Sequence, residues 1–244
     1  MRITSVNNDL IKETAKLLHG KYRNEKGLFL VEGEKGIHEA ILAKLEILNI
    51  FSIEGFENRP ERIEVTEPVL SKISDSKTPP KAVAVVKQPL YKWSDDFKRV
   101  VLLEGIKDPG NLGTILRASA AFKIDAIILY GDTADLYNPK CVRSTVGNLW
   151  KVPVFRLADL SCFADYERIA TLPKGDRVEK LNDYIPFEKV LVMFGSEADG
   201  LSEELKKFAT KNITIEMAEN VESLNLSVSV SILMYKLFVS GINN

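Results

Sequence analysis

The sequence predicts an α/β protein in which a parallel sheet in the second half of the chain follows a smaller α/β unit. Short, almost wholly apolar runs recur in that second half, at 100–103, 126–130, 168–172 and 190–194. Such runs are typical of strands that are buried on both faces of a parallel sheet. Helical patterns separate several of them, at 112–122, 139–146 and 202–208. This alternation of strands and helices predicts a layered α/β architecture.

The first half contains the elements of a compact α/β unit. Asn7 or Asn8 can cap its first helix, which ends before Gly20. The elements of this unit, in chain order, are a helix at 10–18, a strand at 28–31, a helix at 37–42, a strand at 47–53, a helical piece at 69–73 and a strand at 82–86. A polar segment with Pro89 follows and is typical of a linker. We therefore predict a first domain at 1–90, a linker at 91–97 and a second domain at 98–244, which closes with a strand at 213–215 and a helix from about 224 to 239.

The composition is that of an ordinary globular protein, with 45% hydrophobic and 27% charged residues. The formal net charge of −1 argues against a protein that coats nucleic acid nonspecifically, although a local basic surface remains possible. The first segment carries such basic residues, at Lys12, Lys16, His19, Lys21, Arg23 and Lys26, and by charge alone they are typical of a solvated helix face. No apolar stretch reaches the roughly 18–20 residues of a membrane helix, and the N-terminus lacks the core of a signal peptide. We expect a cytoplasmic protein without a membrane partner.

Metal chemistry is not expected from this sequence. The two cysteines, Cys141 and Cys162, have no CxxC spacing and are interpreted as reduced thiols. The only histidines, His19 and His38, form no cluster with them, so a zinc site is not predicted, while carboxylates leave magnesium open. Both histidines precede the glycine-rich half of the chain. Chemistry in that half must depend on Arg, Lys, Glu, Asn, Ser or backbone groups.

The first of three unusual segments covers residues 103–122, where a buried strand enters a Pro/Gly turn and then a helix that starts near Asn111 or Leu112. Asn111 can cap this helix. Arg117 follows within the second turn among apolar neighbours, so we expect it to be buried and to need a partner or a role. The segment matches neither a phosphate-binding P-loop nor the dinucleotide-binding GxGxxG pattern.

The second and third segments also join a strand to a helix. Residues 191–205 place Glu197 in the loop after a strand, where ligands of open α/β sheets bind. Residues 213–237 lead from a strand through a polar loop to Ser223-Leu224-Asn225 and then to a helix rich in serine and valine. Ser227 and Ser231, four residues apart, give this helix a narrow face that another backbone can approach closely.

Together the three segments resemble the SpoU (TrmH) family of RNA 2′-O-ribose methyltransferases, in the SPOUT class. The resemblance rests on Asn-Leu-Gly with Arg117, on Phe-Gly-Ser-Glu followed by Gly-Leu, and on Ser-Leu-Asn-Leu-Ser-Val, over about residues 98–242. More loosely, the runs 29–33 and 37–41 resemble the family's small RNA-binding domain, which is like a ribosomal protein. The resemblance implies an α/β SPOUT domain with a parallel sheet and a deep trefoil knot, preceded by that small α/β domain.

The resemblance also implies the chemistry. S-adenosylmethionine is the expected cofactor, held by the knot loops, and RNA is the expected partner of a homodimer that forms through the knotted domain. The cofactor-binding residues are expected to be Gly195, Ile215, Leu224, Met217 and Leu172, the last in the loop Leu172–Gly175. Arg117 is expected to lower the pKa of the ribose hydroxyl and to stabilise the forming alkoxide, since arginine is a poor base. Asn111, Glu197, Ser223 and Asn225 are expected to position it and the RNA.

Several alternatives remain at this level. Ribosomal RNA is the preferred substrate because the two-domain layout resembles ribosomal RNA enzymes, and transfer RNA is the alternative. A non-catalytic RNA-binding module of the same fold would keep the motifs without the reaction. A Rossmann-type methyltransferase or dehydrogenase is a weaker rival, because the GxG spacing is missing and Tyr130-Gly131 stands where an acidic residue would end the second strand.

Overall fold

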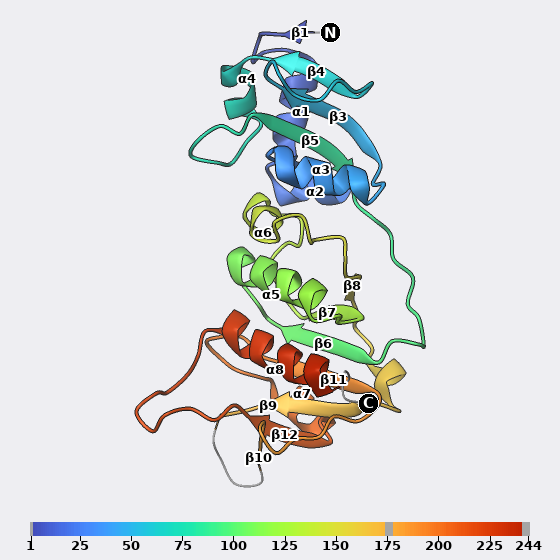
Figure 1. Ribbon diagram of the computed structural model, residues 1–244, viewed down its shortest axis with the longest axis vertical. Helices are drawn as coiled ribbons and strands as arrows, with labels where there is room; N and C mark the ends of the chain where they lie inside the picture. The colour runs from blue at the N-terminus through green and yellow to red at the C-terminus, as the bar shows by residue number, and fades with distance from the viewer. Residues whose placement is uncertain (1, 174–177, 241–244) are drawn as a thin grey trace. The chain divides into compact units, whose positions relative to one another are not determined.

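A computed structural model describes residues 2–173 and 178–240 and divides into two compact units (Figure 1). The first unit combines the chain up to Leu90 with the separate segment Asp135–Trp150. The second unit combines Tyr91–Ala134 with the chain from Lys151 onward. Within the described ranges, no helix has the length and apolar character that crossing a membrane requires.

The first unit is built on a five-stranded mixed sheet with the strand order β1-β4-β3-β5-β2. Its elements are β1 (Arg2–Ile3), α1 (Asp9–Lys16), α2 (Gly20–Lys26), β2 (Leu28–Glu32), α3 (Glu34–Leu42), β3 (Ile47–Ser52), β4 (Arg62–Val65), α4 (Glu67–Lys72), β5 (Ala82–Lys87) and α6 (Pro139–Ser144). Strand β5 runs antiparallel to both β2 and β3, whereas β1, β4 and β3 are parallel to one another. The predicted strands and helices of this half are present, and β1, α2 and β4 are additions that the sequence analysis missed.

Segment Asp135–Trp150 packs into the first unit, although the predicted domain division placed it in the second. Arg23, only 2% exposed, donates from Nε to Asp135 Oδ2 over 2.9 Å and from Nη1 to the Leu17 carbonyl over 2.8 Å. The ring of Phe29 lies 4.8 Å from that of Tyr137, centroid to centroid. The prediction that Arg23 belongs to a solvated basic face is therefore wrong. Its guanidinium is buried, and a buried charge needs a partner such as the Asp135 carboxylate.

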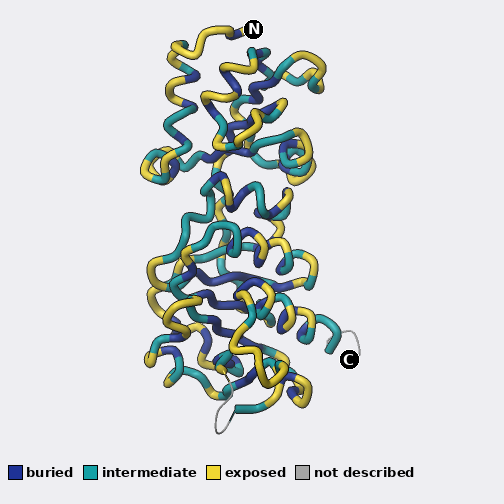
Figure 2. The backbone as a smooth tube through the Cα atoms, turned by 90° about the vertical axis from the view of Figure 1, so that its left-hand side faces the viewer, coloured by how far each residue is buried: buried dark blue, intermediate teal, exposed yellow. Residues whose placement is uncertain are grey.

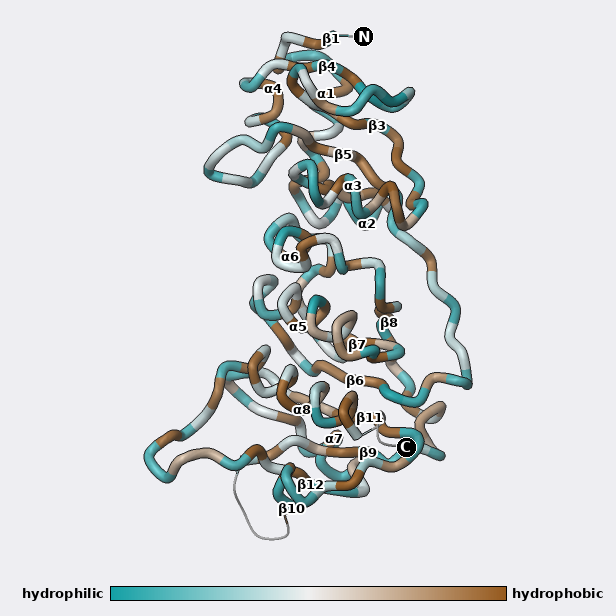
Figure 3. The backbone as a smooth tube through the Cα atoms, in the orientation of Figure 1, coloured by the Kyte–Doolittle hydropathy of each residue, from teal (hydrophilic) through white to brown (hydrophobic). Residues whose placement is uncertain are grey.

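The second unit is a seven-stranded sheet in which all strands are parallel, with the order β10-β12-β9-β11-β6-β7-β8. Its elements are β6 (Arg99–Glu104), α5 (Pro109–Ala121), β7 (Ala126–Tyr130), β8 (Val154–Arg156), the short 3₁₀ helix η1 (Ser161–Phe163), β9 (Glu167–Thr171), β10 (Glu179–Lys180), β11 (Val190–Phe194), α7 (Glu203–Phe208), β12 (Lys211–Thr214) and α8 (Leu226–Ser240). The central strands of this sheet are buried in Figure 2 and hydrophobic in Figure 3. The predicted parallel sheet is confirmed.

Helices α5 and α8 pack against each other, as their neighbouring ribbons in Figure 1 show. The Ser119 hydroxyl lies 3.6 Å from the sulfur of Met234 in the middle of this contact. Phe122 stacks edge to face on Tyr235, with centroids 5.7 Å apart. This packing brings the N-terminal ends of two motif-bearing helices to the same part of the unit.

The parallel register places four strand ends at one edge of the sheet. Leu103 of β6 is paired with Phe194 of β11, and Ala170 of β9 with Met193 of the same strand. Ile213 of β12 is paired with Thr171 at the end of β9. Because the carboxyl ends coincide, the loops that follow these strands lie next to one another, which is where open α/β sheets bind ligands.

Candidate functional site

Three of the predicted cofactor-binding residues come together at the carboxyl edge of the second sheet. Leu172, Gly195 and Ile215 directly follow the neighbouring strands β9, β11 and β12. The Leu172 amide donates to the carbonyl of Ile213 over 2.9 Å, which holds the first of these loops against β12. The end of the predicted loop Leu172–Gly175, from residue 174, lies outside the described residues.

The loop after β11 folds tightly on itself. A Cβ atom added at Gly195 would lie 1.9 Å from the carbonyl carbon of Gly200 and 2.2 Å from the amide nitrogen of Leu201. The Gly200 amide donates to the Ser196 carbonyl over 3.0 Å, and Gly200 itself has φ +67°, which favours glycine. Only a residue without a side chain fits at position 195, and the closed loop presents Glu197 to solvent.

The three motif segments meet through the side chain of Asn111. Its Nδ2 donates to Glu197 Oε1 over 2.6 Å, and its Oδ1 accepts from Nδ2 of Asn225 over 3.2 Å. The expected capping role of Asn111 is wrong, because α5 begins at Pro109 and Asp108 accepts from the Asn111 amide over 2.8 Å. Because Asp108 is the cap, Asn111 lies in the first turn of α5. Its side chain is therefore available to link the other two segments.

Asn225 has a second task at the start of α8. Its Oδ1 accepts from the Ser227 amide over 2.9 Å and from the Ser227 hydroxyl over 2.6 Å, as an N-cap residue does. Helix α8 therefore begins at Leu226, two residues later than predicted. One side chain thus fixes the start of α8 and connects it to α5.

Glu104, at the end of β6, is a further residue of this edge that the sequence analysis missed. Its carboxylate accepts from the Ser202 amide over 2.7 Å, and Ser202 in turn caps α7. This contact fixes the end of the loop that follows β11 against the end of β6. A half-buried acid that ends an otherwise apolar strand is the signal that could have identified it.

Arg117 is exposed, and the expectation that it is buried is wrong. Helix α5 buries Leu112, Ile115 and Ser119, while Thr114, Arg117 and Ala121 form the outward stripe. Asn111, Glu197 and Asn225 are called the Asn111 cluster below. Among the residues that the structure describes, Arg117 makes no hydrogen bond or ion pair, either with this cluster or with another side chain. Its guanidinium is therefore available to a ligand or to another chain.

The remaining predicted site residues lie on the segment between β12 and α8. Ile215, Met217 and Leu224 are half-buried, whereas Ser223 is exposed and contacts no other member of the site. The backbone groups of Ile215 and Leu224 make no backbone hydrogen bond to another described residue. Together with Leu172, these side chains supply apolar area with backbone donors and acceptors beside it, which suits a flat heterocycle such as adenine.

Comparisons with known proteins bear directly on these segments. Residues 98–235 match the SpoU rRNA Methylase family, and residues 8–84 match the MRM3-like substrate binding domain. The chain belongs to the SpoU rRNA methylase family. This membership confirms the resemblance drawn from the three motif segments, whose motifs all lie within the matched range.

Similar proteins cover nearly the whole of this chain. The 23S rRNA (guanosine(2553)-2′-O)-methyltransferase RlmP of Bacillus subtilis is 28% identical, over 97% of this chain and 98% of that protein. The crystal structure of an AdoMet-bound rRNA methyltransferase of Sinorhizobium meliloti has a TM-score of 0.85 at 26% identity and covers 97% of this chain and 96% of its own. The SpoU methyltransferase AviRb of Streptomyces viridochromogenes, in complex with the cofactor AdoMet, has a TM-score of 0.83 at 25% identity and covers 98% and 100%.

Two cavities of this SpoU family protein lie outside the candidate site. One, of about 480 Å³, opens at the amino ends of β6 and β11 beside Tyr184 and Phe187, on the opposite edge of the sheet. The other, of about 300 Å³, belongs to the first unit. Across the described ranges, no three His, Cys, Asp or Glu side chains gather as a metal ion would need.

Variants of Asn225 separate its two tasks. We expect Asn225→Asp to keep the melting temperature close to the wild-type value, because aspartate caps a helix as well as asparagine does. The same variant loses the Nδ2 donor and places a carboxylate beside the Asn111 cluster, so methyl transfer is expected to fall at least about tenfold. Asn225→Ala loses both functions and is expected to be less stable by about 1 kcal/mol. Thermal melts and initial rates measured on both variants check this, and wild-type activity in Asn225→Asp would contradict the proposed link.

Proposed function

We propose that this SpoU family protein transfers the methyl group of S-adenosylmethionine to a ribose 2′-hydroxyl of ribosomal RNA. The observation that carries this is the Asn111 cluster, in which three separate motif segments close on one another at the carboxyl edge of a parallel sheet. Family membership confirms the predicted enzyme class and its methyl donor. The remaining assignments below concern this chain's own residues.

The donor fits the loops after β9, β11 and β12. Bound there, S-adenosylmethionine supplies an electrophilic methyl group on a sulfonium centre. Leu172, Ile215, Met217 and Leu224 would cover its apolar surface, and the backbone at Gly195 can approach it closely because position 195 has no side chain. These residues remain the proposed cofactor-binding set.

We also propose the deep trefoil knot that the family resemblance implies. Strand β12 lies on the far side of β9 from β11, yet α8, which follows it, packs on α5. The connecting segment must therefore cross the carboxyl edge of the sheet beside the loop 195–201, and Asn225 joins Asn111 where this crossing ends. A chain segment that crosses a closed loop in this way supports a knotted arrangement.

Catalysis is assigned chiefly to alignment and electrostatics. Holding the ribose oxygen about 3–3.5 Å from the methyl carbon supplies much of the acceleration. An arginine guanidinium is a poor general base, so the role of Arg117 is to favour the ionised ribose oxygen, and the proton leaves to water or phosphate. Asn111, Glu197 and Asn225 hold the site together, and Ser223, which is exposed, would contact the RNA backbone.

Ribosomal RNA is the proposed substrate for two reasons. The relative in Bacillus subtilis is named for 23S rRNA, and the first unit carries the match to a substrate binding domain. We therefore assign RNA recognition to 1–90 and methyl transfer to 98–244, with 135–150 packed on the recognition unit. A ribosomal RNA substrate also supports the cytoplasmic location expected from the sequence.

The reaction is tested by supplying the protein with unmodified 23S rRNA and S-adenosylmethionine and analysing the nuclease-digested RNA by mass spectrometry. A nucleoside that gains a methyl group on its ribose supports the proposal. A methyl group on a base, or methylation of transfer RNA alone, would replace the proposed substrate or position. Absence of donor binding by calorimetry would favour the non-catalytic RNA-binding module.

A homodimer through α5 and α8 would complete the site. Val228, Ile232 and Tyr235 form an exposed apolar stripe on α8, with the free Arg117 on the adjoining helix. An exposed apolar stripe beside an unpaired cation is typical of an association surface. A second protomer docked on this stripe would cover it and bring Arg117 toward the partner's donor.

The dimer is tested by Ile232→Asp. Because position 232 is exposed, the variant is expected to fold, but a buried carboxylate at the interface would separate the protomers. We expect a monomer in sedimentation experiments and methyl transfer reduced at least about a hundredfold by loss of alignment. Ile185→Asp, the same change at an exposed position between β10 and β11, is the matched control and should leave both properties unchanged. A dimeric, fully active Ile232→Asp variant would contradict the interface.

A further inference from the structure

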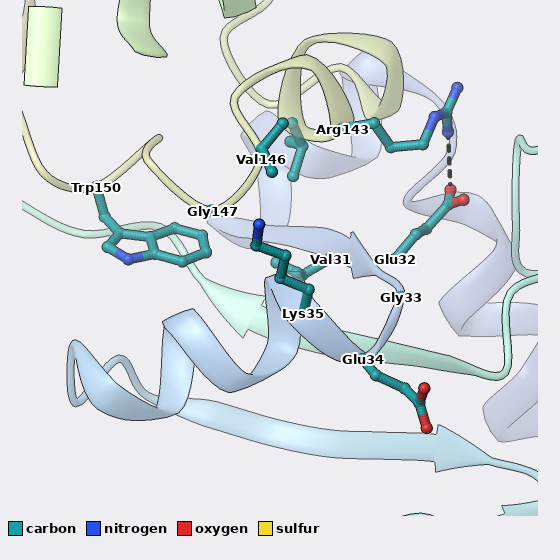
Figure 4. A pocket seen from close by; sticks show the side chains of 11 residues that line it. Val31, Glu32, Gly33, Glu34, Lys35, Arg143, Val146, Gly147 and Trp150 are labelled. Carbon is teal, nitrogen blue, oxygen red and sulfur yellow. Dashed lines mark hydrogen bonds and ion pairs between the residues drawn. The ribbon is translucent and has the colours of Figure 1, made fainter. Parts of the chain in front are cut away.

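A cavity of about 300 Å³ in the first unit has no part in the methyl-transfer site (Figure 4). It lies where the corner between β2 and α3 faces α6 and the chain that follows α6. Apolar and aromatic side chains supply much of its wall, among them Val31, Val142, Val146 and Trp150. In Figure 4 the Trp150 ring extends toward the cavity from the end of the α6 segment.

The cavity lining carries two cations, Lys35 and Arg143, and two carboxylates, Glu32 and Glu34, of which Glu34 extends away from the cavity in Figure 4. Lys35 projects into it in Figure 4 and makes no ion pair with any described residue. Arg143 lies opposite and binds the carboxylate of Glu32 over 3.2 Å. That carboxylate, on a side chain only 3% exposed, also accepts hydrogen bonds from two serine hydroxyls, at Ser74 and Ser76. Arg143 also binds the carboxylate of Asp75 over 3.2 Å, so both carboxylates beside it are compensated. Lys35 is then the cation in the lining that is available to attract an anion.

The wall beside Trp150 is held in a strained conformation. Val146 has φ +51°, a left-handed value that β-branched residues rarely adopt, and its apolar side chain is exposed. Gly147 follows with φ +81°, and a Cβ there would lie 2.7 Å from Cγ of Glu39. The segment is thus pressed against α3 with Val146 forced outward. Strain of this kind clusters at binding sites.

We propose that this cavity binds one unpaired nucleotide of the RNA substrate, with its base against Trp150 and Val146 and its phosphate near Lys35 and Arg143. The proposal rests on the proposed function, because it needs an RNA substrate. Sequence-specific RNA recognition uses unpaired bases packed on aromatic side chains with cations at the phosphates. The volume is at the lower end of the range for small-ligand sites, which suits one nucleotide rather than a duplex.

Two variants test the cavity through RNA affinity. Val146→Gly removes the apolar wall and also relieves the left-handed strain, so its melting temperature should equal or exceed that of the wild type. Its KM for unmodified 23S rRNA is expected to rise about fivefold with kcat unchanged, and Lys35→Ala should behave alike. Lys207→Ala, which removes an exposed lysine of α7 in the second unit, is the matched control and should leave KM unchanged.

Crosslinking gives an independent answer. After ultraviolet irradiation of the full-length protein with unmodified 23S rRNA and digestion by trypsin, we expect a nucleotide on the peptide 144–151, which holds Val146 and Trp150. No adduct on this peptide, together with wild-type KM in both cavity variants, overturns the proposal and leaves the cavity to a protein partner. That result is distinct from failure of the proposed function, in which the wild-type protein transfers no methyl group to ribosomal RNA.

Discussion

Replacing Arg117 with alanine is expected to reduce methyl transfer by at least about a hundredfold, the cost of removing one group that stabilises developing oxyanion charge. The affinity for S-adenosylmethionine should stay within about twofold of the wild type, because Arg117 contacts none of the proposed donor-binding residues in its own chain. Stability should also be unchanged, since the side chain is exposed and makes no hydrogen bond or ion pair with other described residues. Single-turnover rates, calorimetry with the donor and thermal melts measure the three quantities.

Two further variants identify the cause of this loss. Arg117→Lys keeps a positive charge but loses the planar fork, so partial activity is expected if charge is the main contribution. Lys207→Ala removes an exposed cation from α7 and should leave activity unchanged. An Arg117→Ala enzyme with wild-type rates would mean that another group stabilises the alkoxide.

The strands of the parallel sheet could be predicted because their sequence carries the signal directly. A strand buried on both faces, such as β11, has no polar position to interrupt the apolar run. Strand β4 (Arg62–Val65) was missed because only two of its four residues are buried and its short alternation is easily read as loop. The order of the strands in the sheet could not be read at all, because pairing joins residues far apart in sequence.

The burial of Arg117 was misjudged for a geometric reason. Its sequence neighbours Leu116 and Ala118 are apolar, but successive residues of a helix lie about 100° apart around its axis. The buried stripe of α5 runs through Leu112, Ile115 and Ser119, and Arg117 falls between its repeats. Apolar neighbours in sequence therefore do not imply an apolar environment in a helix.

The candidate site was partly predictable, since three motifs named the residues but not their contacts. The link from Asn111 to Glu197 joins residues 86 apart, and the link to Asn225 joins residues 114 apart. Likewise, Arg23 and Asp135 are 112 residues apart, so no local pattern indicated that 135–150 would pack on the first unit. One consequence is that removing residues 1–90 would strip Asp135–Trp150 of its packing partners, including Phe29 against Tyr137.

Gly195→Ala is expected to have the largest effect of any single methyl group added to the chain. The new Cβ would lie 1.9–2.2 Å from backbone atoms of Gly200 and Leu201, which cannot rotate away as a side chain can. The loop 195–201 must open, so Glu197 loses its place beside Asn111 and the donor loses one wall of its site. A misplacement of about 1 Å at the reacting groups costs about a hundredfold in rate, and we expect at least that loss in methyl transfer. Calorimetry should also show weaker binding of S-adenosylmethionine than in the wild type.

Gly200→Ala is the matched control within the same loop. Nothing lies within 4 Å of a Cβ at position 200, so this variant adds only the strain of φ +67°, about 1–2 kcal/mol. It should melt a few degrees lower than the wild type and still bind the donor within about threefold. Because both variants add one methyl group to one loop, a difference between them isolates the close approach at Gly195 from general loop strain. If both bound the donor equally well, the closed loop after β11 would have no part in holding it.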